Sequence, residues 1–198
     1  MTDLPTDPRL LEVLDSLYAR QPENQIRPRL EPTRRLVEYM GSPQENFKIV
    51  HITGTNGKTS TARIIERLLR EHGLRTGRLT SPHLVHFNER IALDGEAVSD
   101  QRIIDAFEEN ESLMDLVDSE LEEQGEPPLT FFEAMTALAF HIFSDAPIDV
   151  LVLEVGIGGE WDATNVADAD VAVFTTIALD HQKTLGNTVE EIANTKSG

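Results

Sequence analysis

The hydrophobic positions of this chain change repeatedly between strand-like and helix-like spacing. Short runs rich in β-branched residues, typical of buried strands, occupy residues 47–52, 75–80, 148–155 and 171–177. The last two runs are nearly continuously apolar, which is the pattern of strands buried on both faces. Segments of helical spacing separate these runs, and the alternation predicts an α/β fold with a mostly parallel sheet flanked by helices.

Several segments of the chain have the hydrophobic spacing of helices, with recognisable start and turn signals. Residues 8–20, 33–40, 61–72, 100–123 and 130–144 have apolar positions every three or four residues. Thr130 and Glu133 have the spacing of a capping box, and a shorter helix begins at Thr188 with the same spacing. Asp94-Gly95 marks a tight turn, which predicts a hairpin or an excursion from the main sheet.

The amino-acid composition argues against some classes of function and some kinds of site. The formal net charge is −18, which argues against a nucleic-acid binder, because such proteins neutralise phosphates with Lys and Arg. The chain has no cysteine, so disulfides and thiolate metal sites are excluded, and no segment reads as a signal peptide or membrane span. We expect a soluble cytoplasmic protein. Arg27 and Arg29 stand out in a turn-rich link and are most simply interpreted as solvated charges.

A glycine-rich segment follows the first predicted strand and precedes a helix. It reads Gly-Thr-Asn-Gly-Lys-Thr-Ser at residues 54–60. Glycines let backbone N–H groups converge on phosphate oxygens, and the helix N-terminus adds roughly half a positive charge. Lys58 is placed to reach terminal phosphates, and Thr59 or Ser60 to supply a hydroxyl group. Ile52 stands where the full Walker pattern has glycine, so an ordinary glycine-rich turn is the alternative interpretation.

Polar residues also follow the other predicted strands. Ser81 follows the second strand, Glu154 ends the third, and Asp180-His181 follows the fourth. Ligands gather outside the carboxyl ends of parallel strands, so we expect these residues to meet the glycine loop at one crevice. A hydroxyl, a carboxylate and an imidazole there could bind a divalent ion, although imidazole alone favours manganese, zinc or no metal. Taken singly, each residue also has a purely structural interpretation.

Lys196 lies in the last turn of the final predicted helix. A lysine there usually interacts with the helix dipole. A desolvated lysine with a lowered pKa has a second use, because reaction with carbon dioxide makes a carbamate anion that can ligate metal. The residues alone leave both interpretations open.

Five segments, in this order and at these separations, resemble one known family. They are HITGTNGKTS, LTSPHLVHFNERI, LTFFEAMTALAF, LEVGIGGEWDATN and LDHQKTLGNTVEEIANTKSG, and they span most of residues 47–198. The pattern is similar to the N-terminal half of folylpolyglutamate synthase and bifunctional dihydrofolate synthase, members of the Mur ligase superfamily. The resemblance implies an N-terminal helical cover at residues 1–46 and an incomplete P-loop ATP-binding domain, the Mur ligase central domain, at residues 47–198.

The resemblance implies an ATP-dependent amide ligase of folate biosynthesis and one-carbon metabolism. ATP would phosphorylate a carboxylate of dihydropteroate or folate, and the amine of L-glutamate would attack the acyl phosphate. The implied partners are these small molecules, with Mg²⁺ as the metal and with neither nucleic acid nor membrane. The complete protein is expected to be a monomer.

The resemblance also implies roles for individual residues. The ATP-binding set is Thr55, Asn56, Gly57, Lys58, Thr59 and Ser60. One magnesium ion would be held by Ser81 and Glu154, and a second by Glu154, His181 and a carbamylated Lys196. The catalytic set is Lys58, Glu154, His181 and Lys196. The pterin side would be lined by Ile26, Arg27, Pro28, Thr130, Phe131, Phe132, Glu133, Trp161, Asp162 and Ala163.

Two positions depart from the usual family pattern. Thr59 stands where many members have glycine, and Gln182-Lys183-Thr184 follows His181. Thr59 is closer to the wall-peptide ligases of the superfamily, so a cell-wall precursor ligase is one alternative, and a nucleotide-binding remnant without ligase activity is another. Because the family continues into a second domain that supplies adenine and glutamate contacts, we expect this chain alone to have weak or no ligase activity.

Overall fold

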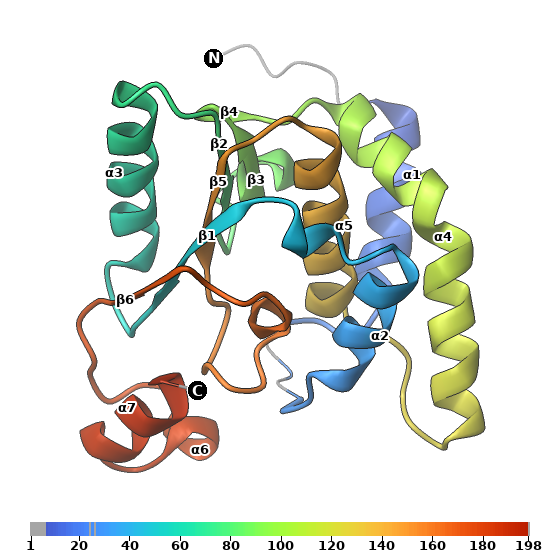
Figure 1. The fold of residues 1–198 in the computed structure, drawn as a ribbon. Coiled ribbons are helices and arrows are strands. Elements are labelled where there is room, and N and C mark those ends of the chain that lie inside the picture. Colours follow the sequence, from blue (N-terminus) through green and yellow to red (C-terminus); the bar gives the residue numbers. More distant parts are fainter. Residues whose placement is uncertain (1–6, 24, 26, 198) are drawn as a thin grey trace.

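The computed structural model describes residues 7–23, 25 and 27–197, and within them six strands form one sheet (Figure 1). The strands are β1 Lys48–Thr53, β2 Thr76–Leu79, β3 Ile91–Leu93, β4 Glu96–Ala97, β5 Val150–Glu154 and β6 Val171–Phe174. Their order across the sheet is β4-β3-β2-β5-β1-β6. Strands β2, β5, β1 and β6 are parallel, which confirms the predicted α/β class. The hairpin of β3 and β4 extends the same sheet in antiparallel fashion.

The predicted helices are confirmed, with ends that differ by a few residues. They are α1 Pro8–Tyr18, α2 Glu31–Tyr39, α3 Lys58–Glu71, α4 Asp100–Glu123, α5 Phe131–Asp145 and α7 Val189–Ser197. Helix α3 begins at Lys58, earlier than its apolar spacing indicates, because Gly57 adopts a left-handed conformation and starts the helix there. Helix α6 Gln182–Leu185 is too short to give a periodic signal. The 3₁₀ helices are η1 Pro43–Glu45, η2 Phe87–Arg90 and η3 Ala163–Val166.

The helices divide unequally between the two faces of the sheet. Helix α5 lies against one face, with α4, α1 and α2 outside it, and α3 lies on the other face (Figure 1). The main hydrophobic core joins α5 to the N-terminal helices through Leu10, Leu17, Leu36 and Val37, each at most 1% exposed. The N-terminal helices therefore share the core of the sheet domain, and the boundary expected at residue 46 stays a prediction.

The exposure of strand β6 differs from the prediction made from its sequence. Its apolar sequence predicts burial on both faces, yet β6 is an edge strand of the described sheet, with Val171 50% and Phe174 51% exposed. The prediction is wrong because α3 packs over β1, β2 and β5, and no second helix in the described residues covers β6 beside it. Ile64 and Leu68 on the outer side of α3 are also exposed.

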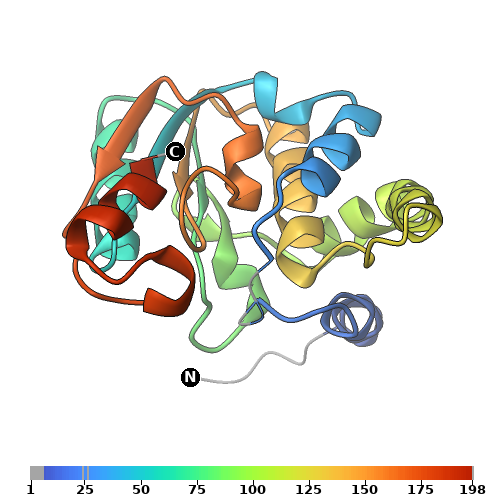
Figure 2. The ribbon, with the colours of Figure 1, turned by 90° about the horizontal axis from the view of Figure 1, so that it is seen from below.

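The carboxyl ends of the parallel strands lie together at the lower end of the molecule. Viewed from below in Figure 2, the link between α1 and α2, the loop after β2, η3 and the pair α6 and α7 surround this end. No helix in the described part of the chain combines the length and the apolar character needed to cross a membrane. The segments that carry the predicted site residues are thus gathered at one end of the sheet.

Candidate active site

The glycine loop after β1 is fixed to the segment that follows β6. The backbone N–H of Thr55 donates to the carbonyl oxygen of Thr176 at 2.8 Å. The Thr55 hydroxyl donates to the carbonyl oxygen of Ala178 at 3.1 Å and accepts from the Ala178 N–H at 3.0 Å. Gly54 has φ +145°, and a Cβ there would lie 1.9 Å from Oγ1 of Thr175. Glycine is therefore required where the loop passes this segment.

Lys58 lies across the loop that it follows. Its ammonium group donates to the carbonyl oxygens of Gly54 at 3.0 Å and Thr55 at 3.4 Å. Gly57, with φ 84°, begins α3 without a side-chain cap for the N–H groups of its first turn. A lysine beside uncapped helix N–H groups offers positive charge and donors to a phosphate. This arrangement fits the nucleotide role that the glycine loop predicts.

Glu154, at the end of β5, joins the glycine loop to the loop after β2. Its side chain is buried, and its two carboxylate oxygens accept from Oγ1 of Thr59 at 3.0 and 2.9 Å. Burial raises the pKa of this carboxyl, opposed by the Thr59 hydrogen bond, the Lys58 charge and the Ser81 backbone N–H. A carboxylate with two neighbouring hydroxyl-bearing residues is an oxygen-rich set that suits Mg²⁺.

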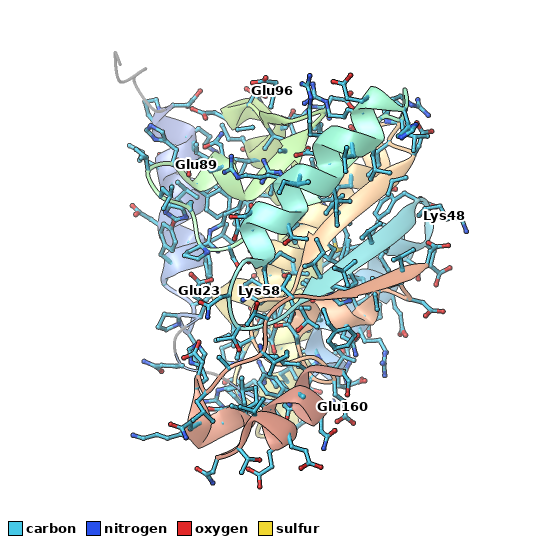
Figure 3. All side chains as sticks on the ribbon, turned by 90° about the vertical axis from the view of Figure 1, so that its left-hand side faces the viewer. Glu23, Lys48, Lys58, Glu89, Glu96 and Glu160 are labelled. Carbon is cyan, nitrogen blue, oxygen red and sulfur yellow. The ribbon has the colours of Figure 1, made fainter. Side chains whose placement is uncertain are left out.

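A cavity of about 290 Å³ opens at the carboxyl ends of the parallel strands. Lys58, Ser81, Gly156 and His181, which follow β1, β2, β5 and β6, line one part of it. Segments after all four strands thus share this cavity as predicted, but Glu154 itself is buried and is not among the lining residues. The link between α1 and α2, the start of α5 and the segment around η3 also line the cavity, through Pro22, Glu23, Gln25, Arg27, Arg29, Thr130, Phe132, Glu133, Trp161, Asp162 and Ala163. Figure 3 shows Lys58 at the lower end of α3, with Glu23 at a similar height.

The start of α5 forms a charged part of the cavity wall. Thr130 and Glu133 form the predicted capping box, in which the Thr130 N–H donates to Glu133 at 2.7 Å. Arg29 donates to the same carboxylate through Nε at 2.8 Å and Nη2 at 2.9 Å, and to the carbonyl oxygen of Pro127 at 2.9 Å. Arg29 is thus paired with Glu133, and its interpretation as a solvated charge is wrong. Local sequence could not indicate this pair, because the two residues lie far apart in the chain. Arg27 is exposed, as that interpretation expects.

Asp162 presents a buried carboxylate to the cavity. It accepts from the Ile157 N–H at 2.7 Å, from the Thr164 N–H at 3.0 Å and from the Thr164 hydroxyl at 2.5 Å. Burial raises the pKa of this carboxyl, and these hydrogen bonds act in the opposite direction. The Gly156 N–H also lowers the pKa of this carboxyl, and together these donors hold the carboxylate in one orientation at the cavity.

Some predicted residues do not line this cavity. Phe131 is 3% exposed, and its ring packs with Tyr18 and Phe87 in the core, whereas the adjacent Phe132 reaches the cavity. Pro28 is also absent from the lining, and Ile26 lies outside the described residues. Thr55, Asn56, Gly57, Thr59 and Ser60 lie in the loop and first turn beside the cavity. Sequence reasoning missed Glu23 and Gln25, because no local pattern reports which side chains of an irregular link face a cavity.

Lys196, on α7, lines a second cavity of about 220 Å³. Its side chain is buried, and its pKa is lowered by burial and by Lys58, while Asp162 and Asp180 act in the opposite direction. A Cβ at Gly159 would lie 2.6 Å from the Lys196 carbonyl oxygen, so glycine permits the close approach of α7 to the loop after β5. The described residues contain no group of three or more His, Cys, Asp or Glu side chains that could hold a metal ion, and the two-magnesium ligand set stays a prediction.

Residues 52–198 match the Mur ligase middle domain. The chain is 45% identical over 192 residues to a dihydrofolate synthase/folylpolyglutamate synthase of Mycobacterium tuberculosis, covering 96% of this chain and 39% of that protein. The protein of that name from Escherichia coli is 42% identical over 147 residues, covering 74% and 32%.

Solved structures give the same picture. Folylpolyglutamate synthase of Mycobacterium tuberculosis complexed with ADP superposes with a TM-score of 0.88 at 45% identity, covering 96% of this chain and 41% of that one. Escherichia coli FolC in complex with DHPP and ADP has a TM-score of 0.84 at 36% identity, covering 96% and 43%. The chain thus spans about two fifths of the length of the similar proteins from Mycobacterium tuberculosis.

Proposed function

The chain belongs to the Mur ligase family through its middle domain, and from this premise we propose that it carries the nucleotide and pterin sites of an ATP-dependent ligase that joins L-glutamate to dihydropteroate, to folate or to both. The observation that carries the proposal is the single cavity described above. The phosphate-binding candidate Lys58 lines this cavity together with Phe132, Trp161 and Asp162. The named relatives, and the relative solved with ADP and DHPP, support the same assignment.

The nucleotide side of the site binds and orients ATP. Lys58 exchanges the carbonyl oxygens of Gly54 and Thr55 for phosphate oxygens, and the N-terminus of α3 provides backbone donors. A substrate carboxylate oxygen attacks the γ-phosphorus, the bond to the bridging oxygen breaks, and ADP leaves. This step depends on positioning and charge neutralisation and needs no nucleophile from the protein. Glu154, Thr59 and Ser81 would hold Mg²⁺, which supplies positive charge at the phosphate oxygens.

The acyl phosphate formed in this way is the acceptor for glutamate. The amine nitrogen attacks the acyl carbon, the carbon–oxygen bond to phosphate breaks, and the amine loses a proton. Phe132 and Trp161 offer aromatic surface to a pterin ring, and Asp162 accepts hydrogen bonds from its N–H groups. Glu133 contributes less acceptor capacity, because Thr130 and Arg29 already donate to its carboxylate.

The proposal includes carbamylation of Lys196. Its lowered pKa favours the neutral amine, whose nitrogen can attack carbon dioxide with loss of a proton. The resulting anion would add an opposite charge near Lys58 and an oxygen ligand for a metal shared with Glu154 and His181. A carbon-13 carbamate resonance from protein kept in labelled bicarbonate, lost in Lys196→Met, is the expected result. Its absence from the unsubstituted chain would contradict carbamylation.

Binding of dihydropteroate tests the proposed function directly. The chain has one tryptophan, Trp161, so its fluorescence reports on the cavity. We expect a saturable change on titration with dihydropteroate, corrected for pterin absorbance, and a weaker response in Asp162→Ala. The control Asp168→Ala changes an exposed carboxylate nearby. A folded chain that gives no saturable change, with or without MgATP, contradicts the pterin assignment.

The nucleotide and acceptor assignments need a second measurement. MgADP should displace a fluorescent nucleotide from the chain, and Lys58→Met should weaken that binding. Among dihydropteroate, tetrahydrofolate and wall peptides, only the true acceptor should then give a saturable change in Trp161 fluorescence in the presence of MgADP. Saturable binding of a wall peptide alone would replace the folate assignment with the cell-wall alternative.

A further inference from the structure

His51 is a half-buried polar residue for which the proposed mechanism has no use. It lies on β1 between Val50 and Ile52, and it lines the second cavity. Its Nε2 is 2.8 Å from Oγ1 of Thr164, on η3. This contact ties the central part of the sheet to the segment that carries Asp162.

The chemistry of the three groups determines the direction of their hydrogen bonds. The Asp162 carboxylate only accepts, so the Thr164 hydroxyl donates its one hydrogen to Oδ1 at 2.5 Å. The Thr164 oxygen must then accept from His51, which requires a hydrogen on Nε2. Burial lowers the pKa of His51 to about 4, so the neutral ring carries its single hydrogen at that nitrogen. The chain of donors runs from His51 through Thr164 to Asp162.

These hydrogen bonds limit how the Asp162 carboxylate can rotate. Oδ1 accepts from both the N–H and the hydroxyl of Thr164, which uses its two acceptor positions. Oδ2 accepts from the Ile157 N–H, and the Gly156 N–H also acts on this carboxyl. Asp162, Gly156 and Ile157 all line the cavity. A rotation of the carboxylate would break the Thr164 bonds and leave the hydroxyl without an acceptor in a buried place.

We propose that His51 and Thr164 are positioning residues, which hold the Asp162 carboxylate so that Oδ2 faces the N–H donors of a bound heterocycle. The inference rests on the proposed function, because it takes Asp162 to be a substrate-binding residue. It adds a specificity element on β1 that acts from the side of the sheet where the second cavity lies. Neither residue needs to touch the substrate for this role.

The tautomer of His51 is the first test, and it needs no ligand. A protonated Asp162 would reverse every bond: Asp162 would donate to Thr164, Thr164 to Nε2, and the ring hydrogen would move to Nδ1. Long-range proton–nitrogen correlation spectra of the nitrogen-15-labelled chain at neutral pH distinguish the Nε2–H tautomer of His51 from the Nδ1–H tautomer. We expect the Nε2–H form. The Nδ1–H form, or a doubly protonated ring, would overturn the inference.

Paired substitutions provide the second test. His51→Gln keeps an N–H donor within reach of Thr164 and His51→Leu removes it, while Thr164→Ser keeps the hydroxyl and Thr164→Val removes it. We expect the Kd for dihydropteroate, measured from Trp161 fluorescence, to rise about 10-fold in His51→Leu and Thr164→Val. The conservative member of each pair should stay within about 2-fold of the unsubstituted chain. MgADP affinity and the circular dichroism spectrum of each variant are the controls, because a loss in either would indicate general damage to β1.

The outcomes separate this inference from the proposed function. Equal losses within each pair, or equal losses of dihydropteroate and MgADP affinity, would assign His51 and Thr164 a purely structural role and overturn the inference. Failure of the unsubstituted chain to bind dihydropteroate would contradict the proposed function. The tautomer would still decide whether the donor chain exists, since that spectrum is recorded without ligand.

Discussion

At the scale of single residues, the candidate site gathers groups whose charged forms are disfavoured by burial. Burial raises the pKa of Glu154 and Asp162, and it lowers the pKa of Lys196 and His51. Each shift favours the neutral form, and hydrogen bonds or opposite charges partly offset it in Glu154, Asp162 and Lys196. Sites that bind charged ligands often hold such groups, because a ligand can supply the charge that the empty site lacks.

His51 makes the free energy of unfolding depend on pH. Its pKa is about 6.5 in an unfolded chain and about 4 in the folded one. Between these values the unfolded chain binds more protons, so stability falls as the pH is lowered from 6.5 to 4 and this contribution is constant below 4. The full loss is about 3 kcal/mol. Urea unfolding of the unsubstituted chain and His51→Gln from pH 4.5 to 7.5 should diverge below pH 6.5, and parallel curves would contradict a buried neutral histidine.

Gly159 controls how closely α7 can approach the loop after β5. A Cβ there would lie 2.6 Å from the backbone carbonyl oxygen of Lys196, so Gly159→Ala must displace the helix. We expect faster amide hydrogen exchange over residues 189–197, with protection in β1 and β5 unchanged. Asn194→Ala changes an exposed residue of the same helix and is the control. Unchanged exchange in Gly159→Ala would mean that α7 is not held against this loop.

At the scale of elements, a buried ion pair joins α3 to the sheet. Nε of Arg78, on β2, donates to Glu66, on α3, at 2.6 Å, and both side chains are 5% exposed. Glu66 also accepts from the Gly95 N–H at 3.0 Å, and Arg78 donates to the Thr80 hydroxyl at 2.9 Å. Three segments therefore share one network: α3, β2 and the turn between β3 and β4.

Removing one partner of this pair should be strongly destabilising. Glu66→Leu leaves a buried guanidinium without a counter-charge, and we expect a loss of about 3–5 kcal/mol in urea unfolding. The double variant Glu66→Leu/Arg78→Met buries no charge and should recover much of that loss. Arg75→Met breaks an exposed pair with Asp149 and should change the stability much less, because solvent screens such a pair. A double variant no more stable than Glu66→Leu would show that packing, rather than the unpaired charge, sets the cost.

At the scale of the whole molecule, the acidic charge opposes the folded state. The formal net charge of −18 is spread over 198 residues, and like charges repel more strongly in the compact chain. Salt screens this repulsion, since the Debye length falls from about 30 Å at 0.01 M to about 3 Å at 1 M. Exposed ion pairs are weakened by the same screening, but each contributes little.

Thermal stability should therefore rise with ionic strength. We expect the Tm to increase by a few degrees between about 0.02 and 0.5 M NaCl, measured by circular dichroism. Glu111→Lys/Glu122→Lys changes two exposed residues of α4 and takes the formal charge from −18 to −14, so its Tm should rise less. A Tm that falls with added salt would mean that attractive pairs outweigh the net repulsion.

The sequence by itself determined the features that depend on neighbouring residues. Apolar periodicity located the long helices and parallel strands, the Thr130 and Glu133 spacing located the start of α5, and the glycine-rich segment located the loop between β1 and α3. Strand order is not local, but the rule that ligands gather at carboxyl ends was enough to predict that Ser81 and His181 share a crevice with Lys58.

Only the tertiary structure decided which side chains meet across the fold. Arg29 pairs with Glu133 across 104 positions, and His51 reaches Thr164 across 113. It also decided that Phe132 rather than Phe131 lines the cavity, and that one face of β6 is left uncovered. The physical reason is that local patterns report backbone preference and the apolar side of an element, whereas partners and exposure depend on how separate elements pack.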